Sequence, residues 1–96
     1  MYEIKRIPKF VREYNRLVRR NSRLEDKVER TLVRLESNPF EKSLRTHKVH
    51  AEGFGLAWSS SVSGDIRIIW RFVPNAHKII LLLAMGGHSG GGKVYK

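Results

Sequence analysis

The chain has 96 residues, no cysteine, and 19 lysines and arginines against 9 aspartates and glutamates, which gives a net charge of +10 at pH 7. This length supports one domain over residues 1–96 with a single core, and the charge favours a polyanionic partner. The lack of cysteine excludes disulfides and thiolate metal sites and favours a reducing, cytoplasmic location.

The first third of the chain predicts a strand and two helices. Residues 2–7 alternate weakly and predict a strand, after which a proline suits the first turn of a helix. Residues 8–20 place their apolar side chains on one helical stripe. A second helix is predicted from Ser22, which forms a capping-box pattern with Glu25, to about residue 37. We expect an antiparallel helical hairpin that packs on a sheet.

The rest of the chain predicts the sheet. Alternating patterns predict strands at 45–49, 56–62 and 66–73, and an unbroken apolar run predicts a central strand at 79–83. That run is far shorter than the roughly 20 residues that span a bilayer, so we expect a soluble protein with no membrane partner. The expected class is α+β, with an N-terminal strand, a helical hairpin and a mostly antiparallel four-stranded sheet in two layers.

Two arginines and a histidine near the C-terminal end are candidate functional residues. Arg67 and Arg71 alternate with Ile68 and Trp70, so they point to the face opposite the helices, where their guanidinium groups can bind phosphate. His88 follows the last strand in a glycine-rich segment, where an imidazole can transfer protons. Each of the three also fits an ordinary solvated side chain.

The stretch around residue 47 adds further cations. His47 and His50 form a weak His-x-x-His pattern without neighbouring carboxylates, so we predict no metal and no other cofactor. His47, Lys48 and Arg45 are instead candidates for the same basic face as Arg67. RNA can be cut without a metal where a base, an acid and cations surround the phosphate.

Four short motifs in this order resemble the RelE/ParE superfamily of bacterial and archaeal toxins, and among them the YafQ-like messenger-RNA interferases. They are Leu-Arg-Thr-His-Lys-Val at 44–49, Gly-Leu-Ala-Trp-Ser at 55–59, Arg-Ile-Ile-Trp at 67–70 and Gly-Gly-His-Ser at 86–89. The resemblance implies a RelE-like fold and an endoribonuclease of a type II toxin–antitoxin pair. Such a toxin cuts messenger RNA on the ribosome and is held inactive by a cognate antitoxin.

The resemblance also implies residue roles. The catalytic positions are His88, Arg67, His47 and Tyr95, and the RNA-binding positions are Arg45, Lys48 and Arg71. Tyr95 follows His88 at a longer spacing than the family pattern has. Two alternatives remain open at this point, a ParE-like toxin that binds DNA gyrase and a toxin that has lost catalysis and only binds its antitoxin.

Overall fold

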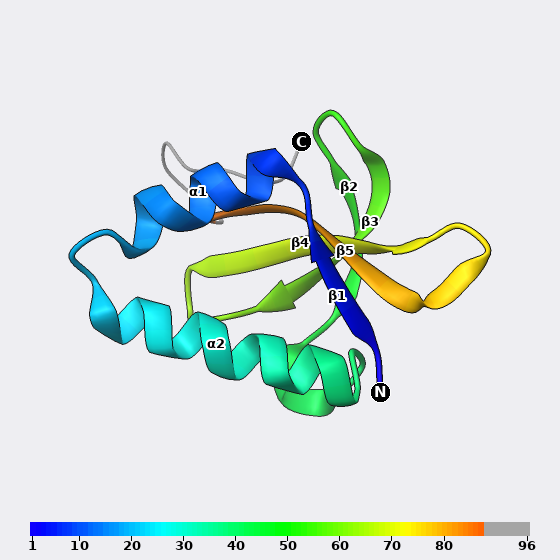
Figure 1. Ribbon diagram of the computed structural model, residues 1–96, viewed down its shortest axis with the longest axis horizontal. Coiled ribbons are helices and arrows are strands. Elements are labelled where there is room, and N and C mark those ends of the chain that lie inside the picture. Colours follow the sequence, from blue (N-terminus) through cyan, green and yellow to red (C-terminus); the bar gives the residue numbers. More distant parts are fainter. Residues whose placement is uncertain (88–96) are drawn as a thin grey trace.

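Two helices cover one face of a five-stranded sheet in the computed structural model, which describes residues 1–87 (Figure 1). The elements follow one another as β1 (Glu3–Arg6), α1 (Pro8–Val18), α2 (Ser22–Ser37), the 3₁₀ turn η1 (Lys42–Leu44), β2 (His47–Ala51), β3 (Gly55–Ser61), β4 (Ile66–Val73) and β5 (Ala76–Gly87). The predicted α+β class is confirmed. No helix within the described residues is long and apolar enough to cross a membrane.

The two helices form the predicted antiparallel hairpin (Figure 1). The N-cap of α2 is Asn21, whose Oδ1 accepts a hydrogen bond from the backbone N–H of Leu24 at 3.1 Å. The predicted capping box at Ser22 and Glu25 is therefore wrong by one residue, because an asparagine side chain caps a helix as well as a serine does. The C-cap residue Arg19 has a ψ of 123°, outside the helical region, so α1 ends at Val18, two residues before the predicted limit.

The sheet has the strand order β1-β5-β4-β3-β2. All neighbours are antiparallel except β1, which runs parallel to β5 with Ile4 opposite Ile80. The N-terminal strand thus joins the sheet as a fifth strand, whereas the sequence predicted four strands beside it. The alternation of residues 2–7 marks a strand but carries no information on its partner, which tertiary packing selects.

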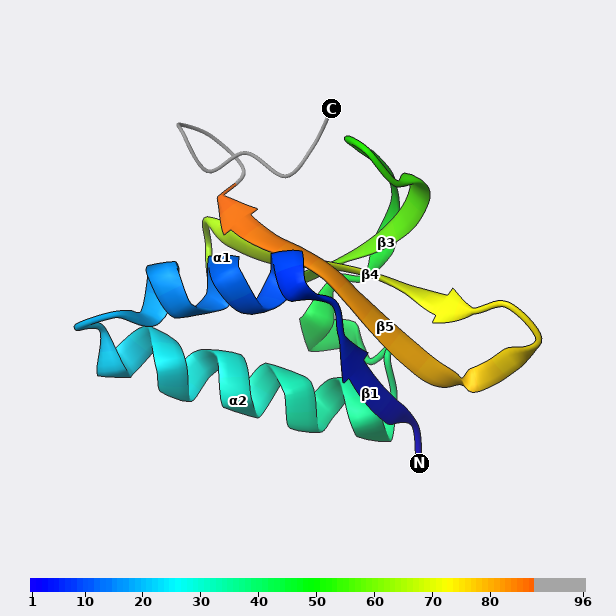
Figure 2. The ribbon, with the colours of Figure 1, turned by 45° about the horizontal axis from the view of Figure 1, so that its top comes forward.

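Apolar side chains fill both faces of the sheet. The larger cluster lies between the helices and the sheet and includes Phe10 from α1, Leu35 from α2 and Trp70 from β4. A smaller cluster on the other face is centred on Ala51, Ala57, Ile69, Leu83 and Ala84. Because β5 contributes to both clusters, the predicted burial on both faces is confirmed, but β5 lies between β1 and β4 and the central strand is β4. Figure 2 shows the two helices on one side of the sheet only.

A chain of hydrogen bonds ties the start of β2 to the larger cluster. Trp70 Nε1 donates to Ser60 Oγ at 2.8 Å, Ser60 Oγ lies 2.6 Å from Thr46 Oγ1, and Thr46 Oγ1 lies 2.6 Å from the carbonyl oxygen of Pro39. An indole N–H only donates and a carbonyl only accepts, so Ser60 donates to Thr46 and Thr46 donates to Pro39. The segment that leads into His47 is thereby fixed to a buried tryptophan.

Candidate functional site

The candidate site lies on the face of the sheet that the helices leave uncovered, here called the open face. Its polar positions on β2, β3 and β4 are His47, Ser59, Ser61, Arg67 and Arg71. They alternate along their strands with the side chains that pack beneath the helices. The two rows of cross-strand neighbours run from His47 through Ser59 to Ile69, and from Ser61 through Arg67 to Gly86.

His47 is exposed at the start of β2, and its ring has a fixed orientation. Its Nδ1 lies 2.9 Å from the backbone carbonyl oxygen of Arg45. Because a carbonyl oxygen can only accept, Nδ1 is the donor in this contact, and in the tautomer that this defines the lone pair is on Nε2. A histidine in this tautomer can take a proton through Nε2.

The turn before β2 presents that carbonyl group. Arg45 closes η1 with a φ of 50°, a left-handed conformation that is rare for a side chain of this size. At the other end of η1, the Glu41 carboxylate accepts hydrogen bonds from the hydroxyl group of Ser43 and, at 2.7 Å, from its backbone N–H. These contacts, led by the one from the hydroxyl group, lower the pKa of Glu41.

Arg67 is half-buried, and the β3–β4 turn holds its guanidinium group. Nη1 donates to Ser61 Oγ at 2.6 Å and to the carbonyl oxygen of Ser63 at 3.0 Å, and Ser61 Oγ donates to the same carbonyl at 3.0 Å. No other hydrogen bond or ion pair engages this guanidinium within residues 1–87. The donors on Nη2 and Nε are therefore available to an anion, in the geometry that suits a phosphate group.

His47 and Arg67 lie on the same face of the sheet, on two strands that are separated by β3. They are two strands apart and offset by two residues, so their Cα atoms are separated by about 12 Å at ordinary strand spacings. Arg71 is on the same face as Arg67, opposite Leu81 of β5. Among the candidate residues, the open face therefore presents the His47 imidazole and the guanidinium groups of Arg67 and Arg71, and Arg45 is exposed in the segment before β2.

Lys48 does not share this face. It lies opposite Trp58 on the helix side of β2, and its Nζ is 5.7 Å from the centre of the Trp58 ring. The expectation that Lys48 and His47 line one face is therefore wrong, because successive side chains of a strand point to opposite faces. Two further candidates, His88 and Tyr95, lie outside the described residues.

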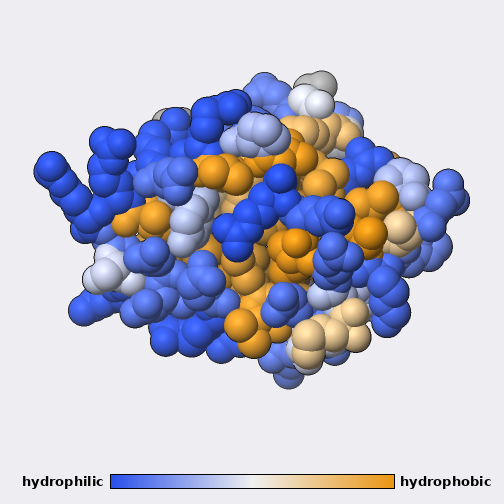
Figure 3. Space-filling model, viewed as in Figure 1, coloured by the Kyte–Doolittle hydropathy of each residue, from blue (hydrophilic) through white to orange (hydrophobic). Residues whose placement is uncertain are grey.

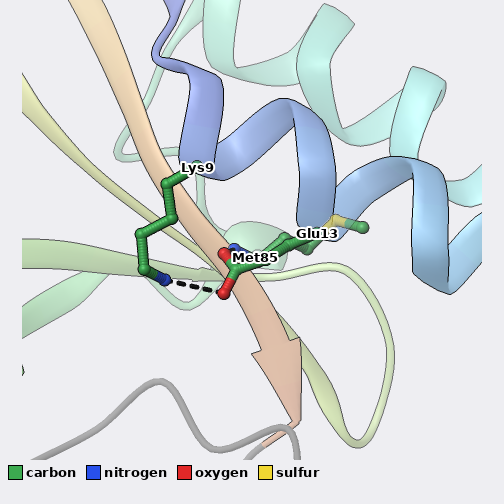
Figure 4. Close-up of polar contacts among 3 residues, drawn as sticks. All are labelled: Lys9, Glu13 and Met85. Atoms are coloured by element: carbon green, nitrogen blue, oxygen red, sulfur yellow. Dashed lines mark hydrogen bonds and ion pairs between the residues drawn. The ribbon is translucent and has the colours of Figure 1, made fainter.

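The end of β5 beside Arg67 is secured from α1. β1 pairs with β5 only as far as Leu82, so the backbone N–H of Met85 lies beyond the last strand pair. Glu13 Oε1 accepts this N–H at 3.0 Å, and Glu13 Oε2 pairs with Lys9 Nζ at 2.6 Å (Figure 4). The next residue, Gly86, lies opposite Arg67, so this contact fixes the strand that pairs with the Arg67 segment of β4.

The sequence reasoning missed the residues that orient the site, namely Ser61, Ser63 and Glu13. A signal for the serines exists, because a hairpin closed around residues 63–65 places Ser61 opposite Arg67. Glu13 has no such signal, since its partner is a backbone group 72 residues away. No cluster of three or more histidine, cysteine, aspartate or glutamate side chains that could hold a metal occurs within residues 1–87.

Comparison with known proteins was made at the level of sequence and of structure. The chain matches no protein-family model, and no curated protein matches it in sequence. Three similar solved structures are a metal-bound toxin from Helicobacter pylori, a YoeB/ParE toxin from Agrobacterium tumefaciens and the DinJ–YafQ toxin–antitoxin complex from E. coli.

All three similarities extend over almost the whole chain. The H. pylori toxin has a TM-score of 0.72 and 17% identity, with 92% of this chain and 96% of that chain covered. The A. tumefaciens toxin has a TM-score of 0.71 and 14% identity, with coverages of 91% and 99%. YafQ in its complex has a TM-score of 0.69 and 15% identity, with coverages of 91% and 92%.

The chain has the RelE/ParE toxin fold. The fold that the four sequence motifs implied is thus confirmed, at identities where sequence comparison alone finds no relative. Within the RelE/ParE fold of this chain, the motif residues His47 and Arg67 fall on one face of the sheet. Lys48, although part of the same motif as His47, falls on the other.

Proposed function

We propose that this protein is the toxin of a type II toxin–antitoxin pair and that it cleaves messenger RNA on the ribosome without a metal. One observation carries the proposal: the open face presents a histidine with its Nε2 lone pair directed away from its backbone contact, together with an arginine whose guanidinium is already held by the β3–β4 turn. The toxin fold and the net charge of +10 support the same conclusion.

In the proposed reaction His47 Nε2 takes the proton of a ribose 2'-hydroxyl. The 2'-oxygen attacks the adjacent phosphorus atom, the bond from phosphorus to the 5'-oxygen breaks, and the products are a 2',3'-cyclic phosphate and a 5'-hydroxyl. Arg67 stabilises the charge on the crowded phosphate through Nη2 and Nε. His88 and Tyr95 are catalytic positions by the family resemblance, and in this proposal His88 protonates the leaving 5'-oxygen while Tyr95 stacks on the RNA.

The remaining cations of the open face bind the RNA backbone in this proposal. Arg71 and the exposed side chain of Arg45 lie on either side of the cleavage position and contribute charge rather than chemistry. Lys48 lies on the other face of β2, so it contacts the RNA only where the RNA passes around the edge of the sheet that β2 forms.

The second partner is an antitoxin, as for YafQ, which is bound to DinJ in the E. coli toxin–antitoxin complex. An acidic segment that becomes ordered on binding would neutralise the open face. The molecule also offers an apolar anchor, because β1 is an edge strand and the exposed Val33 lies beside it on α2. Figure 3 shows apolar side chains gathered between α1, α2 and β1.

The test is inducible expression in bacteria with primer extension on a reporter message. Wild type is compared with His47→Ala, Arg67→Ala and His88→Ala. We expect cuts in codon register for the wild type and a loss of about 10²–10⁴-fold for a residue that transfers a proton. Arg67→Lys keeps the charge but loses the planar arrangement of donors, so it should restore only part of the activity.

Two matched controls separate chemistry from charge. His50→Ala removes a histidine from the other face of β2, and Arg30→Ala removes an arginine from α2, so both should cut like the wild type. Growth arrest without cuts would overturn the ribonuclease proposal in favour of a gyrase-binding toxin. No growth effect and no cuts would indicate a protein that only binds its antitoxin.

A further inference from the structure

A cavity of about 360 Å³ lies where the helical hairpin meets the β3–β4 turn, away from the open face. Figure 1 shows this turn beside the start of α2. The volume is at the lower end of the ~300–1,000 Å³ range of small-molecule sites. The lining residues come from both helices, from the loop between them and from the turn: Leu17, Asn21, Arg23, Leu24, Lys27, Ser63 and Ile66.

The lining divides into a cationic rim and an apolar floor. Arg23 and Lys27 are exposed and four residues apart on α2, so they project from the same side of the helix. Within residues 1–87 neither charged group takes part in a hydrogen bond or an ion pair. Half-buried Leu17, Leu24 and Ile66 supply the apolar surface. Such a lining suits a ligand with a negative charge at one end and a flat, weakly polar body at the other.

The cavity shares a residue with the support of Arg67. Ser63 lines the cavity, and its carbonyl oxygen accepts the hydrogen bond from Arg67 Nη1. Ile66, which precedes Arg67, lines the cavity from the helix side of the strand. The cavity and the Arg67 guanidinium therefore lie on the two sides of one short turn, and a chain of phosphates bound at Arg67 would have to pass over that turn to reach Arg23 and Lys27.

We propose that this cavity binds one nucleotide of the RNA strand whose cleaved phosphate sits at Arg67. Arg23 and Lys27 hold the phosphate of that nucleotide, and its base lies against Leu17, Leu24 and Ile66. The inference rests on the proposed RNA-cleaving function and adds a second subsite to it. Continuity with Arg67 through Ser63 and the volume of about 360 Å³ favour RNA over an acidic protein segment, which would need an extended groove.

The experiment measures binding of a single-stranded RNA that carries a 2'-deoxy sugar at the mapped cut, so that it binds without being cleaved. The variant is the full-length double substitution Arg23→Ala/Lys27→Ala. Its matched control is Arg12→Ala/Arg16→Ala, which removes the same charge from exposed positions of α1 that do not line the cavity. Dissociation constants are measured at several salt concentrations, for RNAs shortened by one nucleotide at a time from each end.

We expect the cavity variant to bind the long RNA about tenfold more weakly than the control, as loss of a charged hydrogen bond predicts. The salt dependence of log K should become shallower by about 0.7 for the lost phosphate contact. Removing the nucleotide that occupies the cavity should weaken the wild type and the control but leave the cavity variant unchanged. Maximal cleavage rate at saturating RNA should be the same in all three proteins.

Other outcomes distinguish this inference from the proposed function. Normal cleavage and equal RNA affinity in both double variants would overturn the subsite alone. Weaker antitoxin binding with unchanged RNA binding would assign the cavity to an acidic protein segment and likewise overturn it. Wild-type protein that binds RNA but gives no cuts in the primer-extension assay would refute the proposed function, and the length series on unmodified RNA would then still support or exclude the subsite. Absence of any binding to the free RNA would overturn the subsite, and the primer-extension assay would then decide the proposed function by itself.

Discussion

Ser60 and Ser61 are neighbours on β3 but serve opposite faces of the sheet. Ser60 Oγ is buried and accepts the indole N–H of Trp70, whereas Ser61 Oγ accepts Nη1 of Arg67 on the open face. The same hydroxyl chemistry thus stabilises the core on one side and orients a cation on the other. Substitutions on the two faces should separate accordingly into effects on stability and effects on RNA cleavage.

Replacing each serine in turn tests most directly whether Ser60 acts on stability and Ser61 on RNA cleavage. Ser60→Ala leaves the Trp70 indole N–H without its acceptor and the Thr46 hydroxyl without its donor in a buried region, which should cost about 1–3 kcal/mol of unfolding free energy. Ser61→Ala should change stability by no more than about 0.5 kcal/mol but release Arg67 and slow cleavage. Urea denaturation and a cleavage assay on the folded proteins measure the two effects.

Two results for Ser60→Ala and Ser61→Ala would contradict this division of roles between the two serines. If Ser61→Ala unfolds at a lower urea concentration than Ser60→Ala, the hydroxyl group on the open face contributes more to stability than the buried hydroxyl group does. If cleavage is unchanged in Ser61→Ala, the turn does not need this hydroxyl to position Arg67, and the Ser63 carbonyl alone is sufficient.

The faces of the sheet could be predicted from the sequence where large apolar side chains alternate with charged ones, whereas the hydrogen-bond partners could not. The alternation of β4 is strong because Ile68 and Trp70 are large and apolar while Arg67 and Arg71 are charged, so the bounds of β4 and the face of each arginine followed from the pattern. Lys48 was assigned to the wrong face because it was grouped with its neighbour His47 as a cation, although successive side chains of a strand point to opposite faces. His47 and Arg67 were found from motifs, but their hydrogen-bond partners depend on strand register and on a left-handed residue, which the pattern does not encode.

A smaller effect is expected where α1 closes the end of β5. Glu13→Ala leaves the Met85 N–H without its acceptor and should cost about 1 kcal/mol, with faster hydrogen exchange at the Met85 amide. Glu13→Gln keeps a carbonyl oxygen for that amide and loses only the pair with partly exposed Lys9, so its cost should be no more than about 0.5 kcal/mol. Exchange that is equally fast in both variants would show that the charge rather than the oxygen protects the strand.

The smallest effect is expected at Glu41, at the start of the turn η1 that leads from α2 to β2. Hydrogen bonds from Ser43 lower the pKa of this carboxyl group in the folded protein, so Glu41 adds stability above its unfolded pKa and loses it as the pH falls through the lower folded value. Glu41→Gln should therefore flatten the acid side of the stability profile and leave the slope between pH 6 and 8 unchanged, as thermal melts across pH can measure. Ser43→Ala should flatten the same region, because it removes the largest cause of the shift. A stability profile that is unchanged in both variants would contradict the role of Glu41 as the cap of this turn.

The same turn also presents the Arg45 carbonyl group to His47. If the cleavage rate falls over the same acid pH range in which the folded protein loses stability, the turn and the histidine are linked.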